Sequence, residues 1–210
     1  MSSKLILKMS MSLDGFVAGP NGELDWLFRS SDAGSQAWTL DVIGGATMHA
    51  MGRKTWNDMT AFWPYAQSPF AAPMNKVPKV VFTRSRTLSA GATTQAIEDA
   101  RKDDGSRQAA DPEILRGWQN PRVASGDIVA SVRALKAETT GTICAHGGAT
   151  FVRSLIEHDL IDEYYFAVHP VVLGRGLPIF TDARLRDLEL VDSQKFAKGV
   201  VTHSYKKVVR

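Results

Sequence analysis

The stretch Thr142–Leu160, TICAHGGATFVRSLIEHDL, predicts a buried strand joined by a tight turn to a helix. Ile143–Ala145 are apolar or small, as at a strand end, and His146–Gly148 supply the turn. The helical spacing that follows is carried by Phe151, Val152, Leu155 and Ile156. Glycines let the backbone approach a ligand, and the unpaired N–H groups of a helix N-terminus attract negative charge. The stretch therefore predicts an anion site, with a tight connection that binds nothing as the alternative.

Length and composition fit one soluble globular domain, with two small domains as the alternative. The chain has 210 residues and a net charge of +3, with its basic residues scattered, so we expect no nucleic-acid partner. No run approaches the ~20 apolar residues that span a bilayer, and the apolar run Leu5–Leu7 is too short for a signal peptide. Cys144 is the single cysteine, which excludes an intrachain disulfide. We expect a cytoplasmic protein without a membrane partner.

Strand patterns alternate with helical patterns along most of the chain. The predicted strands are Lys4–Ser12, Ala46–Met51, Lys79–Thr83, a short strand ending at Val123, Ile143–Ala145, Tyr164–Leu173, Leu188–Val191 and Val200–Val209. The predicted helices are Ser35–Ile43, Thr55–Phe62, one that Asp127 caps, and one after Gly148. This alternation favours an α/β fold with a largely parallel sheet, and the short turn near Gly199 favours a C-terminal antiparallel hairpin. Pro170 indicates a bulge, an end or an edge in its strand.

Residues 90–117 depart from this rhythm. The segment is polar and charged, and its few apolar residues include Ile97 and Ile114. We interpret it as a surface insertion with one or two short helices, with a lid over the site as the alternative.

Two further strand ends carry anion-binding chemistry. Met51–Trp56 reads MGRKTW, in which a glycine ends a strand, an arginine and a lysine bring two cations, and Thr55 is a suitable N-cap. Thr83–Ser85 combines two hydroxyls with a guanidinium, a set that suits a terminal phosphate. Ligands of open α/β sheets collect at the carboxyl ends of strands. Three such ends predict one long ligand with several phosphates, with three ordinary surface turns as the alternative.

These motifs resemble, in order, the cofactor-binding segments of dihydrofolate reductases. MGRKTW is similar to their phosphate-binding segment, SLDGFVAG to their first strand and following loop, and TRS and HGGATF to their other two cofactor segments. The later stretch LIDEYYFAVHPVVLGRGLPIF resembles the riboflavin-pathway pyrimidine reductases and their stand-alone relatives. The resemblance covers nearly the whole chain except residues 90–117.

The resemblance implies a three-layer αβα fold of the dihydrofolate reductase type, with NADPH as cofactor and a homodimeric assembly. By matching position, Val17, Ala18 and Gly19 would lie along the nicotinamide. Gly52, Arg53, Lys54 and Thr55 would hold the phosphates, with Arg53 near the adenosine 2′-phosphate. Thr83, Arg84 and Ser85 would flank the adenine and the 2′-phosphate. Gly147, Gly148, Ala149, Thr150 and Phe151 would carry the pyrophosphate at the helix N-terminus.

The substrate side departs from dihydrofolate reductases, which place a carboxylate shortly after a Trp-x-x-Pro segment. Here Trp26 is followed by LFRSSD, without the proline and with Asp32 out of register, which favours a helix-capping role for Asp32 over a substrate contact. Asp14 is the candidate catalytic acid, with a turn-forming Asp-Gly pair as the alternative. Trp26 and Trp56 are candidate walls for a flat substrate, or else core residues. The five histidines show no metal-ligand spacing, so we expect no metal.

The sequence thus predicts an NADPH-dependent reductase of a small heterocyclic substrate, most like 5-amino-6-(5-phosphoribosylamino)uracil reductase. Dihydrofolate reductase and a non-catalytic NADPH-binding module are the alternatives.

Overall fold

A mixed sheet is built around the first strand. The structure is a computed structural model that describes residues 3–89, 98, 110–182 and 184–208. Its strands are β1 (Lys4–Ser12), β2 (Met48–Gly52), β3 (Lys79–Thr83), β4 (Arg122–Ser125), β5 (Thr142–Ala145), β6 (Glu163–His169), β7 (Leu188–Lys195) and β8 (Val201–Lys207). They are ordered β4-β3-β2-β5-β1-β6-β8-β7. The strands from β4 to β6 run parallel, and β8 and β7 add an antiparallel pair, which confirms the predicted C-terminal hairpin.

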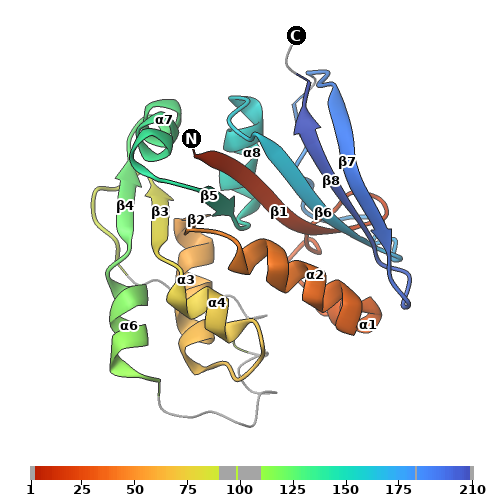
Figure 1. The fold of residues 1–210 in the computed structure, drawn as a ribbon, viewed down its shortest axis with the longest axis horizontal. Coiled ribbons are helices and arrows are strands. Elements are labelled where there is room, and N and C mark those ends of the chain that lie inside the picture. Colours follow the sequence, from red (N-terminus) through yellow and green to blue (C-terminus); the bar gives the residue numbers. More distant parts are fainter. Residues whose placement is uncertain (1–2, 90–97, 99–109, 183, 209–210) are drawn as a thin grey trace.

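Helices cover both faces of this sheet (Figure 1). They are α1 (Trp26–Ser30), α2 (Ala33–Gly44), α3 (Arg53–Phe62), the short 3₁₀ helix η1 (Trp63–Tyr65), α4 (Ala71–Lys76), α6 (Pro112–Gln119), α7 (Ile128–Glu138) and α8 (Ala149–Glu157). Figure 1 shows α7 and α8 on one side and α1, α2, α3, α4 and α6 on the other. The predicted three-layer α/β fold is confirmed. None of the helices within the described residues is long and apolar enough to cross a membrane.

Successive side chains of β1 point alternately to the two faces of the sheet and pack into different cores. Leu5, Leu7, Met9 and Met11 point to one face and join the largest core cluster, in which Val152 and Leu155 of α8 also lie. Ile6 points to the opposite face and packs with Cys144. Burial raises the pKa of the Cys144 thiol to about 12, so this cysteine is an inert core residue.

Several predicted boundaries were wrong. The helix predicted to begin at Thr55 begins at Arg53, because β2 runs straight into it with Gly52 as an extended N-cap. The strand predicted to reach Leu173 ends at His169, before Pro170. The sequence did not predict the short helices α1 and α4.

The end of the predicted insertion belongs to the folded core. Residues 112–119 form α6, and Ile114 packs against a core cluster that includes the fully buried Trp118. Trp118 is tied to the domain because its Nε1 donates to Asn75 Oδ1 at 2.8 Å. The rest of the predicted insertion, apart from residues 98, 110 and 111, lies outside the described residues.

Candidate functional site

Two helix N-termini meet at the carboxyl edge of the sheet. β2 and β5 are parallel neighbours, so the turns into α3 and α8 lie side by side. Gly148 is the N-cap of α8 with φ +80°, and a Cβ there would lie 2.8 Å from Thr55 Oγ1 in the first turn of α3. A Cβ on Gly52 would lie 3.0 Å from Phe151 Cβ. A side chain at either position would collide with the facing helix, so the two glycines allow the first turns of α3 and α8 to lie this close together.

Among the residues that the structure describes, the amides of both helix ends are free of side-chain caps. No described side chain caps the first turn of either α3 or α8. The first N–H groups of a helix have no intrahelical partner, and the helix dipole adds partial positive charge there. The paired ends, Gly52–Thr55 and Gly147–Phe151, therefore have the backbone geometry of an anion-binding edge, and the binding of an anion there stays a prediction.

Two arginines flank this edge on the β3 side. The register pairs Gly52 with Phe82, which brings Arg53 and Arg84 to neighbouring strand ends, and both are exposed. Arg53 donates to Ser89 Oγ at 3.0 Å, a neutral contact that leaves its charge uncompensated by that partner. The remaining predicted cation, Lys54, instead pairs along α3 with a carboxylate at 3.5 Å.

The segment after β1 closes the opposite side of the edge. Val17, Ala18 and Gly19 are buried, and Val17 N donates to Leu177 O at 2.9 Å. Because β1 is the neighbour of β5 on the side away from β2, this segment lies across the anion-binding edge from the arginines. A Cβ on Gly147 would have Met9 of β1 as its nearest neighbour, at 4.0 Å.

Asp14 does not present a free acid to this site. Its carboxylate accepts hydrogen bonds from Gly174 N at 2.7 Å and Leu173 N at 3.2 Å. A hydrogen bond from Ser12, followed by those amides, holds the pKa of the Asp14 carboxyl below its usual range. Its contacts are those of a turn and loop anchor.

Asp32 and Trp56 have structural contacts in place of the predicted substrate contacts. Asp32 caps α2: Oδ1 accepts from Ser35 N at 2.9 Å and Oδ2 from Lys198 N at 2.8 Å. Trp56 is buried in a core cluster, and its Nε1 donates to Trp118 O at 2.9 Å. The helix-cap and core alternatives hold for these two residues.

Trp26 lies beside a set of polar residues, of which the sequence had pointed only to His146, as part of the glycine turn. Trp26 packs edge-on against His169, with ring centroids 5.4 Å apart, and His169 Nδ1 lies 2.8 Å from Ser30 Oγ. On β1, Lys8 Nζ donates weakly to Ser10 Oγ at 3.4 Å. We call Lys8, Ser10, Ser30, His146 and His169 the polar cluster. It lies on the α2 side of β1, β5 and β6.

Lys8 carries the charge of this polar cluster. Burial lowers the pKa of the Lys8 ammonium from 10.5 to about 8. Burial, and then the positive charge of Lys8, lower the pKa of His169 to about 4. Burial, with repulsion from His49 and Lys8, also depresses the pKa of His146. Both histidines are therefore neutral near pH 7, beside one lysine that can lose its proton at mildly alkaline pH. A lysine in the middle of the apolar run KLILKMSMS was the signal for this site.

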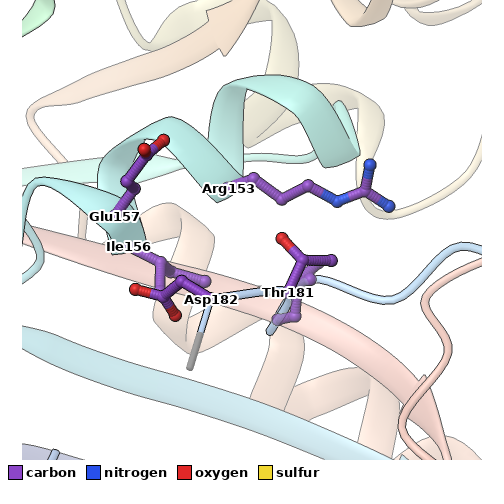
Figure 2. Close-up of a pocket in the computed structure, with 6 residues that line it drawn as sticks. Arg153, Ile156, Glu157, Thr181 and Asp182 are labelled. Atoms are coloured by element: carbon purple, nitrogen blue, oxygen red, sulfur yellow. The ribbon is translucent and has the colours of Figure 1, made fainter. Parts of the chain in front are cut away.

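A separate crevice lies further along α8 (Figure 2). Its volume is about 170 Å³, and Figure 2 shows Arg153 and Glu157 on one side and Thr181 and Asp182 on the other. Arg153 is engaged, because its guanidinium donates twice to Pro178 O, at 2.6 and 2.9 Å. This crevice is separate from the helix N-termini. Within the described residues, no group of three His, Cys, Asp or Glu side chains could hold a metal ion.

The sheet order, with glycine turns and helix N-termini at its carboxyl edge, defines an α/β protein of the dihydrofolate reductase type. The chain matches the family of the RibD C-terminal domain over residues 3–202 and therefore belongs to that family. A curated relative is the uncharacterized protein YyaP of Bacillus subtilis (strain 168), 27% identical over 96% of this chain and 94% of the relative.

Solved structures show the same fold. A putative riboflavin biosynthesis protein from Shewanella sp. PV-4 has a TM-score of 0.67, with 22% identity over all of both chains. A diaminohydroxyphosphoribosylaminopyrimidine deaminase/5-amino-6-(5-phosphoribosylamino)uracil reductase from Thermotoga maritima has a TM-score of 0.65 at 16% identity, over 99% of this chain and 57% of that one. Dihydrofolate reductase from Enterococcus faecalis, complexed with NADP(H), has a TM-score of 0.59 at 14% identity, over 98% and 97% of the two chains.

Proposed function

We propose that the protein is an NADPH-dependent reductase of a small heterocyclic substrate, most like 5-amino-6-(5-phosphoribosylamino)uracil reductase. The observation that carries the proposal is the meeting of two helix N-termini, at Gly52 and Gly148, beside two exposed arginines. No side chain within the described residues caps either of them. Family membership supports the reductase class.

The residues present fit a dinucleotide that carries an extra phosphate. In the proposed arrangement, the N-termini of α3 and α8 bind the pyrophosphate, and Arg53 and Arg84 bind the 2′-phosphate on the β3 side. The other half of the cofactor then extends toward β1 and Val17–Gly19. NADPH, when bound, supplies the hydride, and the protein's own task is to orient the two reactants and exclude water.

The polar cluster supplies the substrate side in this proposal. Lys8 lies on β1, next to the β5 strand that leads into Gly147–Gly148. Its Nζ would donate a hydrogen bond to an electronegative atom of the substrate. With a pKa of about 8, Nζ could also transfer a proton near neutral pH. His169, held by Ser30, and Trp26 would shape the side of this pocket.

The same geometry disfavours dihydrofolate reduction. That chemistry uses a carboxylate to aid protonation of the pterin, and the polar cluster contains a lysine, histidines and serines. Both oxygens of Asp32, the nearest sequence candidate, accept backbone N–H groups. Donor groups around Lys8 suit a substrate rich in carbonyl oxygens, as a uracil is.

Turnover distinguishes the proposal from its alternatives. The protein is mixed with NADPH, and the absorbance of the reduced nicotinamide is recorded over time. The substrate is first 5-amino-6-(5-phosphoribosylamino)uracil and then, in a second experiment, dihydrofolate. We expect wild type to oxidise NADPH in the presence of the uracil compound. The variant Lys8→Met should lose turnover and still bind NADPH. Turnover with dihydrofolate at ordinary enzyme rates would overturn the proposal. NADPH binding without turnover on either substrate would favour the non-catalytic module.

The predicted homodimer and cytoplasmic location remain proposals that rest on the resemblance and the cysteine content. Sedimentation that shows only a 23.0 kDa species would contradict the dimer.

A further inference from the structure

Two segments that are far apart in the sequence are bonded together beyond the end of β1. Residues 12–18 continue from β1 and residues 171–178 follow β6. Val17 N donates to Leu177 O at 2.9 Å, and Leu177 N donates back to Ala18 O at 2.9 Å. We call this pair of segments the latch. Its backbone bonds fix the buried residues Val17 and Ala18.

Asp14 fastens the other end of the latch. Its two carboxylate oxygens accept from Leu173 N at 3.2 Å and Gly174 N at 2.7 Å. Beside it, Leu13 N donates to Val171 O at 2.8 Å. The Asp14 carboxylate thus links the first segment to two backbone amides of the second segment. No other side chain within the described residues forms a hydrogen bond with those two amides.

The sequence of the second segment permits this close approach. A Cβ on Gly176 would lie 2.3 Å from Ala18 O and 2.9 Å from Phe16 Cβ. A backbone oxygen cannot yield as the tip of a side chain can, so residue 176 must be glycine for the segments to lie this close. Asp14 therefore holds the two segments together at one end of the latch, and Gly176 allows their close approach at the other end.

The latch borders one half of the proposed cofactor site. The sheet order places β3 and β2 on one side of β5 and β1 on the other. A dinucleotide bound at Arg84 and at the N-termini of α3 and α8 therefore contacts Val17–Gly19 only through the half that lies beyond its phosphates. The latch borders that half of the ligand and not the half that lies beside Arg84.

We propose that Asp14 is a positioning residue that, through the latch, holds Val17–Gly19 against the nicotinamide half of the bound dinucleotide. The inference rests on the proposed NADPH site. It assigns Asp14 to cofactor placement, where the sequence had suggested a catalytic acid. Loss of Asp14 should weaken the contact with the nicotinamide half and leave the adenosine half unaffected.

The test compares two ligands that differ in that half. NADPH and adenosine 2′,5′-bisphosphate, which lacks the nicotinamide, are titrated into wild type and Asp14→Ala by calorimetry. We expect Asp14→Ala to bind NADPH about tenfold more weakly, the change that one lost charge-assisted contact produces, and to bind the bisphosphate as wild type does. Asp14→Asn, which keeps one acceptor oxygen, should show a smaller loss with the same selectivity. Gly176→Ala should reproduce the selective loss from the other side of the latch.

A control separates positioning from general destabilisation. Asp162 accepts from Leu5 N at 2.7 Å and pairs with Lys136, at the opposite edge of the sheet. Asp162→Ala should lower thermal stability and leave the affinities for both ligands unchanged. Equal loss of both ligands in Asp14→Ala, or no loss of either, would overturn the inference. If wild type binds the bisphosphate but not NADPH, the inference fails; if it binds neither, the proposed function itself fails.

Discussion

Replacing Lys8 with methionine should stabilise the fold while removing a functional group. Lys8 lies on a central strand, flanked by buried residues. Its ammonium has a long contact with Ser10 Oγ at 3.4 Å, and no carboxylate within the described residues forms an ion pair with it. A buried charge without a counter-ion opposes folding, and a methionine of similar length would fill the same space.

The size of the effect follows from the pKa of Lys8. Burial lowers this pKa from 10.5 to about 8, and each pKa unit corresponds to ~1.36 kcal/mol. The charged form therefore costs at most about 3.4 kcal/mol of folding free energy. Because solvent reaches part of the side chain, we expect a gain of about 2 kcal/mol in Lys8→Met. For a protein of this size that is a rise in Tm of roughly 4–8 °C.

The stabilisation should depend on pH in a defined direction. Between pH 8 and 10.5 the unfolded chain holds a proton on Lys8 that the folded protein has lost, so the stability of wild type rises with pH across that window. Below pH 8 both states are charged and the cost is fully present; above pH 10.5 both are neutral and it is gone. The advantage of Lys8→Met is therefore largest near pH 7 and shrinks toward pH 10.5.

Urea unfolding of wild type and Lys8→Met at pH 7 and pH 10 measures this difference. Lys4→Met is the matched control: Lys4 lies on the same strand and face but is more exposed and pairs with Glu163 at 2.9 Å. Its substitution should change the free energy of unfolding by no more than about 1 kcal/mol at either pH. A destabilised Lys8→Met at pH 7, or an advantage that stays constant with pH, would refute the reasoning.

Three further predictions follow from the contacts at the site and in the core. Gly148→Ala should lose about 1–2 kcal/mol of stability and most NADPH affinity, because φ is +80° and the new Cβ would press on Thr55; unfolding and titration that match wild type would contradict the close helix approach. Trp56→Phe should lower the free energy of unfolding by about 1–3 kcal/mol through the lost bond to Trp118 O, while NADPH affinity stays unchanged; a selective loss of substrate binding would restore Trp56 as a pocket wall. Burial, followed by repulsion from a nearby lysine, lowers the pKa of His49 to about 4. The unfolded chain therefore binds more protons than the folded protein between pH 6.5 and pH 4, and stability should fall as the pH drops through this range. Unfolding free energies that stay constant across the range would show that the imidazole is not held neutral.

Local patterns predicted the parts of the fold whose causes are local. The β-branched run at Lys79–Thr83 forms β3 with the predicted ends, and Asp127 caps α7 by accepting from Ala130 N at 2.7 Å. The strand, glycine turn and helix of Thr142–Leu160 also form as predicted, with Gly148 as the N-cap. In each case the residues that decide the structure lie within a few positions of one another.

Long-range partners explain what the sequence did not reveal. Trp56 bonds to a carbonyl 62 positions away, and Asp14 to amides 159 and 160 positions away, so their roles depend on contacts that no local pattern shows. The cap preference of Thr55 was outweighed because Gly52 must lie against Phe151 for the two helices to meet. Lys8 was visible in its strand, but Ser30 and His169 of the same polar cluster come from separate elements.

Titration of NADPH and NADH into wild type, Arg53→Ala and Arg84→Ala tests the central claim most directly. The two cofactors differ by a 2′-phosphate, and a hydrogen bond to a charged group contributes about 1.5–3 kcal/mol. We therefore predict that wild type prefers NADPH and that each variant loses roughly ten- to a hundredfold of its NADPH affinity while NADH binding hardly changes. Absence of NADPH binding in wild type, or equal loss of both cofactors in the variants, would contradict the placement of NADPH at these strand ends.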